Sequence, residues 1–137
     1  MNKPMRIYIA GALSSKEDGK RNPSKVVTDY ITNVHKMCKA ASIVRKKGHY
    51  PFIPCLDFLV GVIAGDWDEE DYRGGSDEFL VVCDAILILS LSYGVRRELA
   101  LATKLGIIIY DDIDKIPDIS DASKDAAEDL LEGVRRG

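Results

Sequence analysis

The residues of this sequence that are best suited to chemistry lie close together, between positions 90 and 98. Two serines, Ser90 and Ser92, precede Gly94, and the carboxylate of Glu98 follows four residues later. Serine hydroxyls and the free N–H groups at the start of a helix bind anions such as phosphate. The spacing therefore predicts an anion site at Ser90, Ser92 and Gly94, with a carboxylate beside it. Two alternatives stay open: Ser92 as a helix cap, and Glu98 as a partner of the helix dipole or of an arginine.

Two further segments offer candidate ligand contacts at the ends of apolar runs. Gly11 directly follows Ala10, the last residue of the run RIYIA at 6–10, and a glycine there lets the backbone pass close to a ligand. Any turn from a strand to a helix can use such a glycine, so this signal is weak alone. Asp57 follows the apolar run YPFIP at 50–54 and is a candidate polar ligand from its position. We include Ala10, Gly11 and Asp57 among the expected substrate-binding residues.

The hydrophobic pattern predicts the elements that must position these residues. Period-two and continuous apolar runs predict strands, and three- and four-residue spacings predict helices. The predicted strands are 6–10, 50–54, 85–90 and 107–110, and the predicted helices are 23–44, 76–82, 95–105 and 123–136, the last of which should cover a remaining face of the sheet. Residues 56–75 are expected to form a mobile connection with one or two helical turns. Its acidic part, with Trp67 and Tyr72, is expected to be a solvated loop and not a lid over a base.

Strands that alternate with helices predict a single α/β domain over residues 1–137. We expect a doubly wound, flavodoxin- or Rossmann-like three-layer sandwich, with a parallel sheet of four to five strands in the order 2-1-3-4. In this order the winding reverses between the first and third strands, and ligands of such sheets bind outside the carboxyl ends at the reversal. The loops after Ala10 and Leu89 should meet there.

Composition and charge exclude several classes of function. The 137 residues are 46% hydrophobic and 30% charged, which is typical of a soluble globular protein. The net charge of -3 and the scattered basic residues argue against a nucleic acid polymer as partner. The longest apolar run, 58–64, falls short of the roughly 20 residues that cross a membrane, and no room for a signal peptide precedes residue 6.

The cysteines and histidines show no pattern that would bind a metal. Cys38, Cys55 and Cys83 form no CxxC pair and no metal-ligand spacing, so we expect reduced thiols and a cytoplasmic protein. His35 and His49 have no matching partner and are expected to be structural. Neither a GxGxxG nor a P-loop motif occurs. We therefore expect no metal and no cofactor.

Three sequence blocks together resemble a known family: IYIAG at 7–11, CDAILIL at 83–89 and SYGVRRELALATKLG at 92–106. Over residues 6–110 the chain is similar to the nucleoside 2-deoxyribosyltransferases and the related 2′-deoxynucleoside 5′-phosphate N-hydrolases. The order and spacing of the three blocks make this resemblance more specific than any one block. It implies cleavage or transfer at the N-glycosidic bond of a nucleoside or nucleoside 5′-monophosphate.

The resemblance also implies roles for individual residues. A glutamate of that family, in a G-x-x-E-L context, attacks the anomeric carbon as the base departs, and Glu98 matches it with one additional residue after the glycine. A carboxylate suits this step because the transition state is oxocarbenium-like. The family's first-strand tyrosine, matched by Tyr8, lies beside the nucleophile; otherwise Tyr8 would be a core aromatic. Ser92 would bind a 5′-phosphate, and Gly11 would line the sugar pocket.

One departure from the family pattern concerns the acid that contacts or protonates the leaving base. Relatives carry an aspartate about eight residues ahead of the position of Asp84, and this chain has Ser76 there. Asp77 is the neighbouring candidate for the acid, if the helix turns it inward; an exposed Asp77 near the helix start is the alternative. The missing acid favours a second hypothesis, a non-catalytic nucleotide-binding or sensing module.

The sequence also predicts a homo-oligomer, at least a dimer, with its interface near the site. A sheet of about four strands leaves a shallow crevice, and a second subunit would supply the missing wall. The apolar run 58–64 is the expected contact, because exposed apolar patches mark interaction surfaces. The alternative is that this run folds back as a core helix of a monomer.

Overall fold

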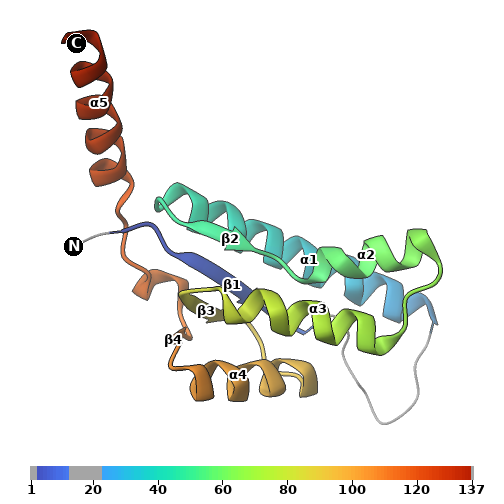
Figure 1. Ribbon diagram of the computed structural model, residues 1–137. Helices are drawn as coiled ribbons and strands as arrows, with labels where there is room; N and C mark the ends of the chain where they lie inside the picture. The colour runs from blue at the N-terminus through green and yellow to red at the C-terminus, as the bar shows by residue number, and fades with distance from the viewer. Residues whose placement is uncertain (1–2, 13–22, 137) are drawn as a thin grey trace.

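The computed structural model describes residues 3–12 and 23–136, and its core is a parallel sheet of four strands in the order β2-β1-β3-β4. The strands are β1 (Arg6–Ala10), β2 (Tyr50–Phe52), β3 (Ala85–Ile88) and β4 (Ile108–Tyr110). The other elements are α1 (Pro23–Lys46), α2 (Cys55–Ala64), α3 (Glu69–Val81), α4 (Tyr93–Leu105), the 3-10 helix η1 (Ile113–Lys115) and α5 (Ser120–Arg136). The predicted α/β class, the doubly wound arrangement and the strand order are confirmed (Figure 1).

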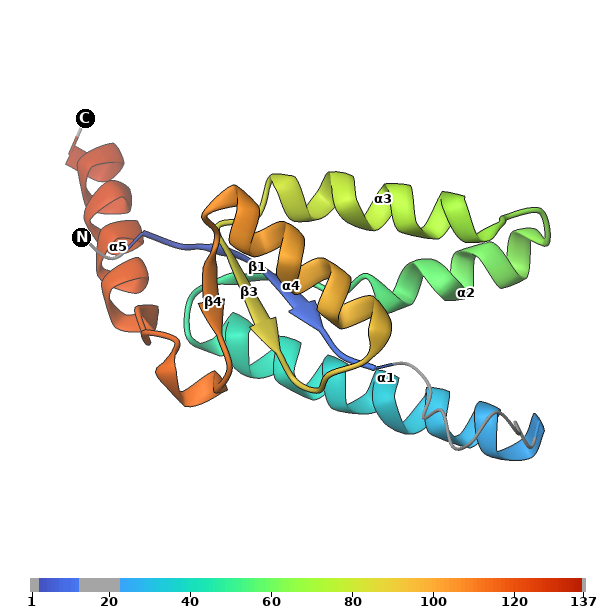
Figure 2. The ribbon, with the colours of Figure 1, turned by 90° about the horizontal axis from the view of Figure 1, so that it is seen from below.

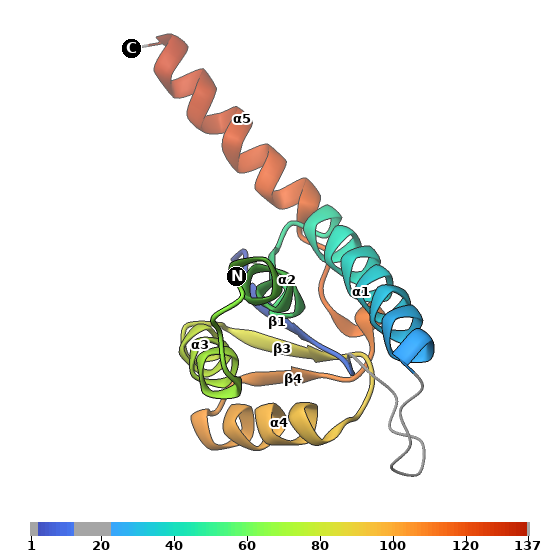
Figure 3. The ribbon, with the colours of Figure 1, turned by 90° about the vertical axis from the view of Figure 1, so that its right-hand side faces the viewer.

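The two central strands, β1 and β3, are buried on both faces, as continuous apolar runs predict. Ile7 and Ile9 point to a core layer shared with α1 and η1. Tyr8 and Ala10 point to the opposite layer, which is shared with α3 and α4. Figure 3 shows these two layers on either side of the sheet. Successive residues of β1 therefore serve different layers, and Tyr8 belongs to the layer that carries α4.

The end of α1 and the start of β2 fix the amino-terminal edge of the sheet. Gly48, which follows α1, has a φ of +97°, the left-handed conformation that glycine commonly adopts after the end of a helix. His49 is buried; its Nδ1 accepts a hydrogen bond from Met5 N (3.0 Å), and its Nε2 donates to the carbonyl of Pro117 (2.7 Å). This arrangement agrees with the structural role expected for His49.

The prediction of a mobile connection over residues 56–75 is wrong. The segment forms α2 and most of α3, which lie side by side (Figures 1 and 2). Asp68 begins α3 with a capping box, because its side chain accepts from Asp71 N (3.0 Å) and Asp71 accepts from Asp68 N (2.9 Å). The acidic run is a helix start, where carboxylates are favoured by the helix dipole. The helix predicted at 76–82 consequently begins at Glu69.

The prediction that the last helix covers a face of the sheet is also wrong. Helix α5 projects away from the body of the molecule (Figures 1 and 3). Its start is held beside the turn after α1, because Ile116 and Ile119 are buried and Ile119 N donates to the carbonyl of Lys47 (2.8 Å). From that anchor the helix leaves the sheet, and Leu130 and Val134 near its end remain exposed.

Of the largely polar segment 14–23, only Pro23, the first residue of α1, lies within the described residues. Within the described residues, no helix combines the length and the hydropathy that crossing a membrane requires.

Candidate active site

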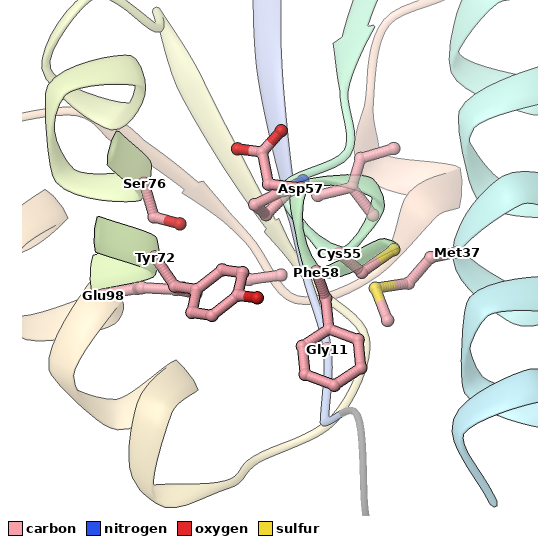
Figure 4. Close-up of a pocket in the computed structure, with 11 residues that line it drawn as sticks. Gly11, Met37, Cys55, Asp57, Phe58, Tyr72, Ser76 and Glu98 are labelled. Atoms are coloured by element: carbon pink, nitrogen blue, oxygen red, sulfur yellow. The ribbon is translucent and has the colours of Figure 1, made fainter. Parts of the chain in front are cut away.

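A pocket opens at the carboxyl ends of the strands, where the sheet order predicts it. Figure 4 shows it between the side chains of α4 and α3 on one side and those of α1 and α2 on the other. Its lining combines strand ends, a short apolar floor and a few polar groups: Ile9, Ala10, Gly11, Met37, Pro54, Cys55, Asp57, Phe58, Tyr72, Ser76 and Glu98. A second hollow lies beside it, lined by Tyr72, Arg73, Ser76, Gly94, Arg97 and Glu98. Tyr72, Ser76 and Glu98 line both hollows.

The carboxylate of Glu98 is fixed by the sheet beneath it. Tyr8, fully buried in β1, donates its hydroxyl proton to Glu98 Oε1 at 2.9 Å, which joins two residues 90 positions apart in the sequence. The bond leaves the second oxygen of Glu98 without a described hydrogen-bond partner. A carboxylate held in one orientation, at the place where two hollows meet, is well positioned to attack a bound molecule.

Burial changes the acidity of both partners. Burial raises the pKa of Glu98 above its ordinary value, and the nearby charge of Asp77 adds to this. The hydrogen bond from Tyr8 and the charge of Arg97 act in the opposite direction, since both favour the carboxylate. Burial, followed by the charge of Glu98, raises the pKa of Tyr8 far above its usual range. Tyr8 therefore keeps its proton and acts as a hydrogen-bond donor, not as a base.

Cys55 is the other potential nucleophile in the pocket lining. Burial raises the pKa of its thiol to about 11. Since the thiolate is the nucleophilic form, this cysteine is unreactive at neutral pH. Of the two carboxylates in the pocket lining, Asp57 and Glu98, Glu98 is the one that accepts a hydrogen bond from a buried side chain within the described residues.

Asp77 lies near Glu98 but does not line either hollow. Its Oδ2 accepts a hydrogen bond from the guanidinium of Arg97 on α4, and its Oδ1 is buried without a partner. Ser76 faces the pocket in its place (Figure 4). The helix phase of α3 thus presents a hydroxyl at the position where the resembling family has an acid.

The serines of the predicted anion site have structural hydrogen bonds in the loop between β3 and α4. Ser92 caps α4, because its Oγ accepts from Val95 N at 3.2 Å. Ser90 Oγ accepts from Ala12 N at 2.9 Å and ties this loop to the one after β1. Each hydroxyl still has a proton to donate. Neither serine lines the pocket or the second hollow; of this predicted group, Glu98 lines both and Gly94 lines the second hollow.

The other predicted binding residues come together around the pocket. Ala10 and Gly11 line it at the end of β1, and Asp57 lines it from the first turn of α2. A side-chain carbon at Gly11 would meet Met37 at 3.4 Å, so the glycine keeps space between the strand end and α1.

Sequence analysis assigned no pocket role to Phe58, and the expectation of a solvated loop around Tyr72 is wrong, since both residues line the pocket. Phe58 of α2 and Tyr72 of α3 project into it (Figure 4), and their rings are 5.7 Å apart. Tyr30 packs on Phe58 at 5.1 Å, and Trp67 packs on Tyr72 at 5.3 Å. Residues 55–64 are almost continuously apolar. Such a run lacks the alternation of polar and apolar residues that would have identified a helix.

Comparisons with known proteins identify no family or relative for this chain. No protein-family model matches the chain, and neither the curated proteins nor the solved structures gave a match. Among the described residues, no cluster of histidine, cysteine or acidic side chains has the form of a metal site. The chemistry must be argued from the geometry of Glu98, Tyr8 and the pocket lining.

Proposed function

We propose that this protein cleaves, or transfers at, the N-glycosidic bond of a deoxynucleoside, a nucleoside or its 5′-monophosphate, with Glu98 as the nucleophile. The observation that carries the proposal is the hydrogen bond of 2.9 Å between Tyr8 and Glu98 at the meeting point of two hollows. The resemblance of residues 6–110 to nucleoside 2-deoxyribosyltransferases and their hydrolase relatives supports the same chemistry. It pairs a tyrosine and a glutamate at these two positions.

The reaction has two steps. One oxygen of Glu98 attacks the anomeric carbon, the bond from that carbon to the base nitrogen breaks, and the electron pair leaves with the base. The result is a glycosyl ester of Glu98. Water, or a second base, then attacks the anomeric carbon, the ester bond breaks and the carboxylate is restored. Hydrolysis and transfer differ only in this acceptor.

The leaving base needs a proton or must depart as an anion. The hydroxyl of Ser76 lines both hollows beside Glu98, and the hydroxyl of Tyr8 donates to Glu98. Asp77 is engaged with Arg97 and does not line the pocket. We therefore expect bases that leave easily to react faster than those that require strong protonation.

The second hollow supplies features suited to an anionic substrate. It is lined by Gly94 at the amino-terminal end of α4 and by the guanidinium groups of Arg73 and Arg97. Helix N-termini and guanidinium groups favour phosphate. Arg73 and Arg97 also pair with Glu69 and Asp77, so a phosphate would compete with these carboxylates. A 5′-monophosphate is therefore the expected substrate form.

A second candidate function is a nucleotide-binding module without catalysis. The observation in its favour is the pairing of Asp77 with Arg97, which leaves Ser76 where an acid would assist departure of the base. Such a module would bind nucleotides in the same pocket and release no base.

The decisive experiment measures free base from a panel of deoxynucleosides and their 5′-monophosphates, with and without an acceptor base. We expect base release by the parent protein and its loss in Glu98→Gln, because the amide is nearly isosteric but cannot form the ester. Glu78→Gln changes an exposed glutamate of α3 and is the matched control. Calorimetry of Glu98→Gln with a monophosphate should still show binding. Binding by the parent without any base release would favour the module instead.

We also propose that the protein acts as a homo-oligomer through α2. Most apolar side chains of this helix are exposed in the single chain, up to 77% for Ile63: Leu56, Phe58, Leu59, Val60, Val62 and Ile63. Phe58 belongs both to this surface and to the pocket lining. A second subunit packed on α2 would shield the pocket from water and strengthen the electrostatics of Glu98.

A further inference from the structure

Helix α5 projects from the body of the molecule, and its described side chains beyond its first residue, those of residues 128–136, are all exposed. It runs for 17 residues, from Ser120 to Arg136, and points away from the sheet (Figure 3). Leu130, Leu131 and Val134 are 73%, 55% and 72% exposed. An isolated helix of this length is marginal in water, and most helices gain their stability from packing of an apolar face.

The carboxyl-terminal half of α5 is amphipathic, with apolar residues on one side of the helix and charged residues on the other. At 3.6 residues per turn, Leu130, Leu131 and Val134 fall on one side, whereas Glu128, Asp129, Glu132, Arg135 and Arg136 fall on the other. The apolar side chains of this helix are therefore concentrated in its carboxyl-terminal half, where they form one small exposed apolar face.

The charges along α5 indicate what the neighbour is. Acidic residues outnumber basic ones up to Glu132, and both arginines, Arg135 and Arg136, follow at the end. An antiparallel copy of the same helix would place its arginines beside the acidic part of the first, and antiparallel alignment also pairs opposite ends of the two helix dipoles. A membrane surface fits poorly, because the polar side is mainly acidic and the apolar side has no aromatic residue.

We propose that α5 is a self-association element, which pairs antiparallel with the α5 of a second copy through Leu130, Leu131 and Val134. A two-fold axis beside Leu130 and Leu131 brings these leucines of the two copies together and directs each Val134 toward the amino-terminal half of the other helix. The helix is about 25 Å long at 1.5 Å per residue, so the contact is at the small end of specific interfaces. Association should accordingly depend on concentration.

This interface is separate from the one proposed on α2. Helix α5 starts beside the turn that precedes β2, at the amino-terminal edge of the sheet, whereas the pocket lies at the carboxyl-terminal edge (Figure 1). The inference does not rest on the proposed function, and variants of α5 should keep the catalytic rate of the pocket.

The first test compares sedimentation of the full chain with that of Leu130→Glu, from about 1 to 100 µM. We expect the parent to associate with rising concentration and Leu130→Glu to lose one association step. It should also lose helical circular dichroism while the Trp67 emission stays constant, since the connection between α2 and α3, which carries Trp67, lies on the side of the molecule away from α5 (Figure 1). Glu128→Gln, on the polar side, is the matched control and should behave as the parent. A parent that sediments at 15.1 kDa throughout, or an unchanged Leu130→Glu, would overturn the proposal.

The second test determines the direction of the pairing. In a Cys38→Ser background, which removes the exposed thiol and leaves the buried Cys55 and Cys83, single cysteines are placed at 130 or 134. We expect Leu130→Cys to form a disulfide between copies and Val134→Cys not to, because in an antiparallel pair the two 134 positions are about 10 Å apart along the axis. Disulfides at both positions would show parallel helices, and disulfides at neither would show unpaired ones. Either result contradicts the proposal.

Discussion

In the proposed reaction the carboxylate of Glu98 attacks in its ionised form, yet this group is largely buried. Burial raises its pKa, and the hydrogen bond from Tyr8 lowers it again. The reactive form is present above the pKa of Glu98 and is lost as pH falls through it. Because that pKa is raised, base release should decline at a higher pH than it would for an ordinary exposed glutamate.

Removing the Tyr8 hydroxyl tests this balance. In Tyr8→Phe the pKa of Glu98 should rise further, so the acid limb of the pH profile of kcat/KM should move to higher pH. At neutral pH we expect roughly tenfold slower base release, the rate equivalent of one hydrogen bond of about 1.5 kcal/mol to a charged group. Tyr50→Phe, in an exposed tyrosine of β2, is the control. An unmoved acid limb in Tyr8→Phe would show that the hydrogen bond does not tune the nucleophile.

The same shift affects folding. A carboxyl group whose pKa is higher in the folded state than in the unfolded state contributes stability below its unfolded pKa, and this contribution is lost as pH rises through the folded pKa. The stability of Glu98→Gln relative to the parent should therefore increase as pH rises from acid to neutral, because the amide carries no charge that burial disfavours. Denaturant unfolding at pH 4 and pH 7.5 measures it, and a difference that stayed constant with pH would contradict this account.

The sequence predicted some of these residues and not others for physical reasons. Glu98 could be found because its helix start has a recognisable serine and glycine, and Tyr8 through the resemblance. The choice between Ser76 and Asp77 could not be made, because it depends on a rotation of α3 by one residue, about 100°. The distance between Asp77 and Arg97 likewise depends on how α3 packs against α4.

At the scale of elements, helices α2 and α3 pack closely where Gly61 of α2 faces Tyr72 of α3. A Cβ added to Gly61 would lie 1.8 Å from Tyr72 Oη, so Gly61→Ala must displace the Tyr72 side chain. Tyr72 lines both hollows, so we expect substrate KM to rise at least roughly tenfold, with a stability cost of about 1–3 kcal/mol. The measurements are steady-state kinetics and thermal unfolding.

Gly74 of α3 provides the matched control. Nothing lies within 4 Å of a Cβ added there, so Gly74→Ala should leave kinetics unchanged and stabilise the helix by roughly 0.5–1 kcal/mol. If Gly61→Ala behaved like Gly74→Ala, Tyr72 would not depend on the glycine for its position.

The two central strands could be predicted because each is a short, continuous apolar run bounded by polar or turn residues. These runs, at 6–10 and 85–88, are typical of strands buried on both faces. In contrast, the acidic residues 68–71 resemble a solvated loop by composition, and their role as a helix start depends on the reciprocal hydrogen bonds of Asp68 and Asp71. The path of α5 depends on the anchoring of Ile119, which no periodicity reveals.

At the scale of the whole molecule, the exposed side of α2 carries a continuous group of apolar side chains, which we propose to be covered by a second subunit. Ile63→Glu puts a charge at its most exposed apolar position, and we expect light scattering to show a smaller assembly and base release to fall in parallel. Leu105→Glu, an exposed leucine at the end of α4, should change neither. A fully active protein of 15.1 kDa would rule out a shared site.

The floor of the pocket, formed by β1, is much more deeply buried than its wall formed by α2. Ile9 and Ala10 of the floor are almost completely buried, whereas most of the apolar side chains of α2 face outward. Backbone amides of β1 should therefore exchange with deuterium only through global unfolding, and those of α2 through frequent local opening. A ligand could enter while the walls open and the sheet stays intact, and binding should slow exchange in the walls alone.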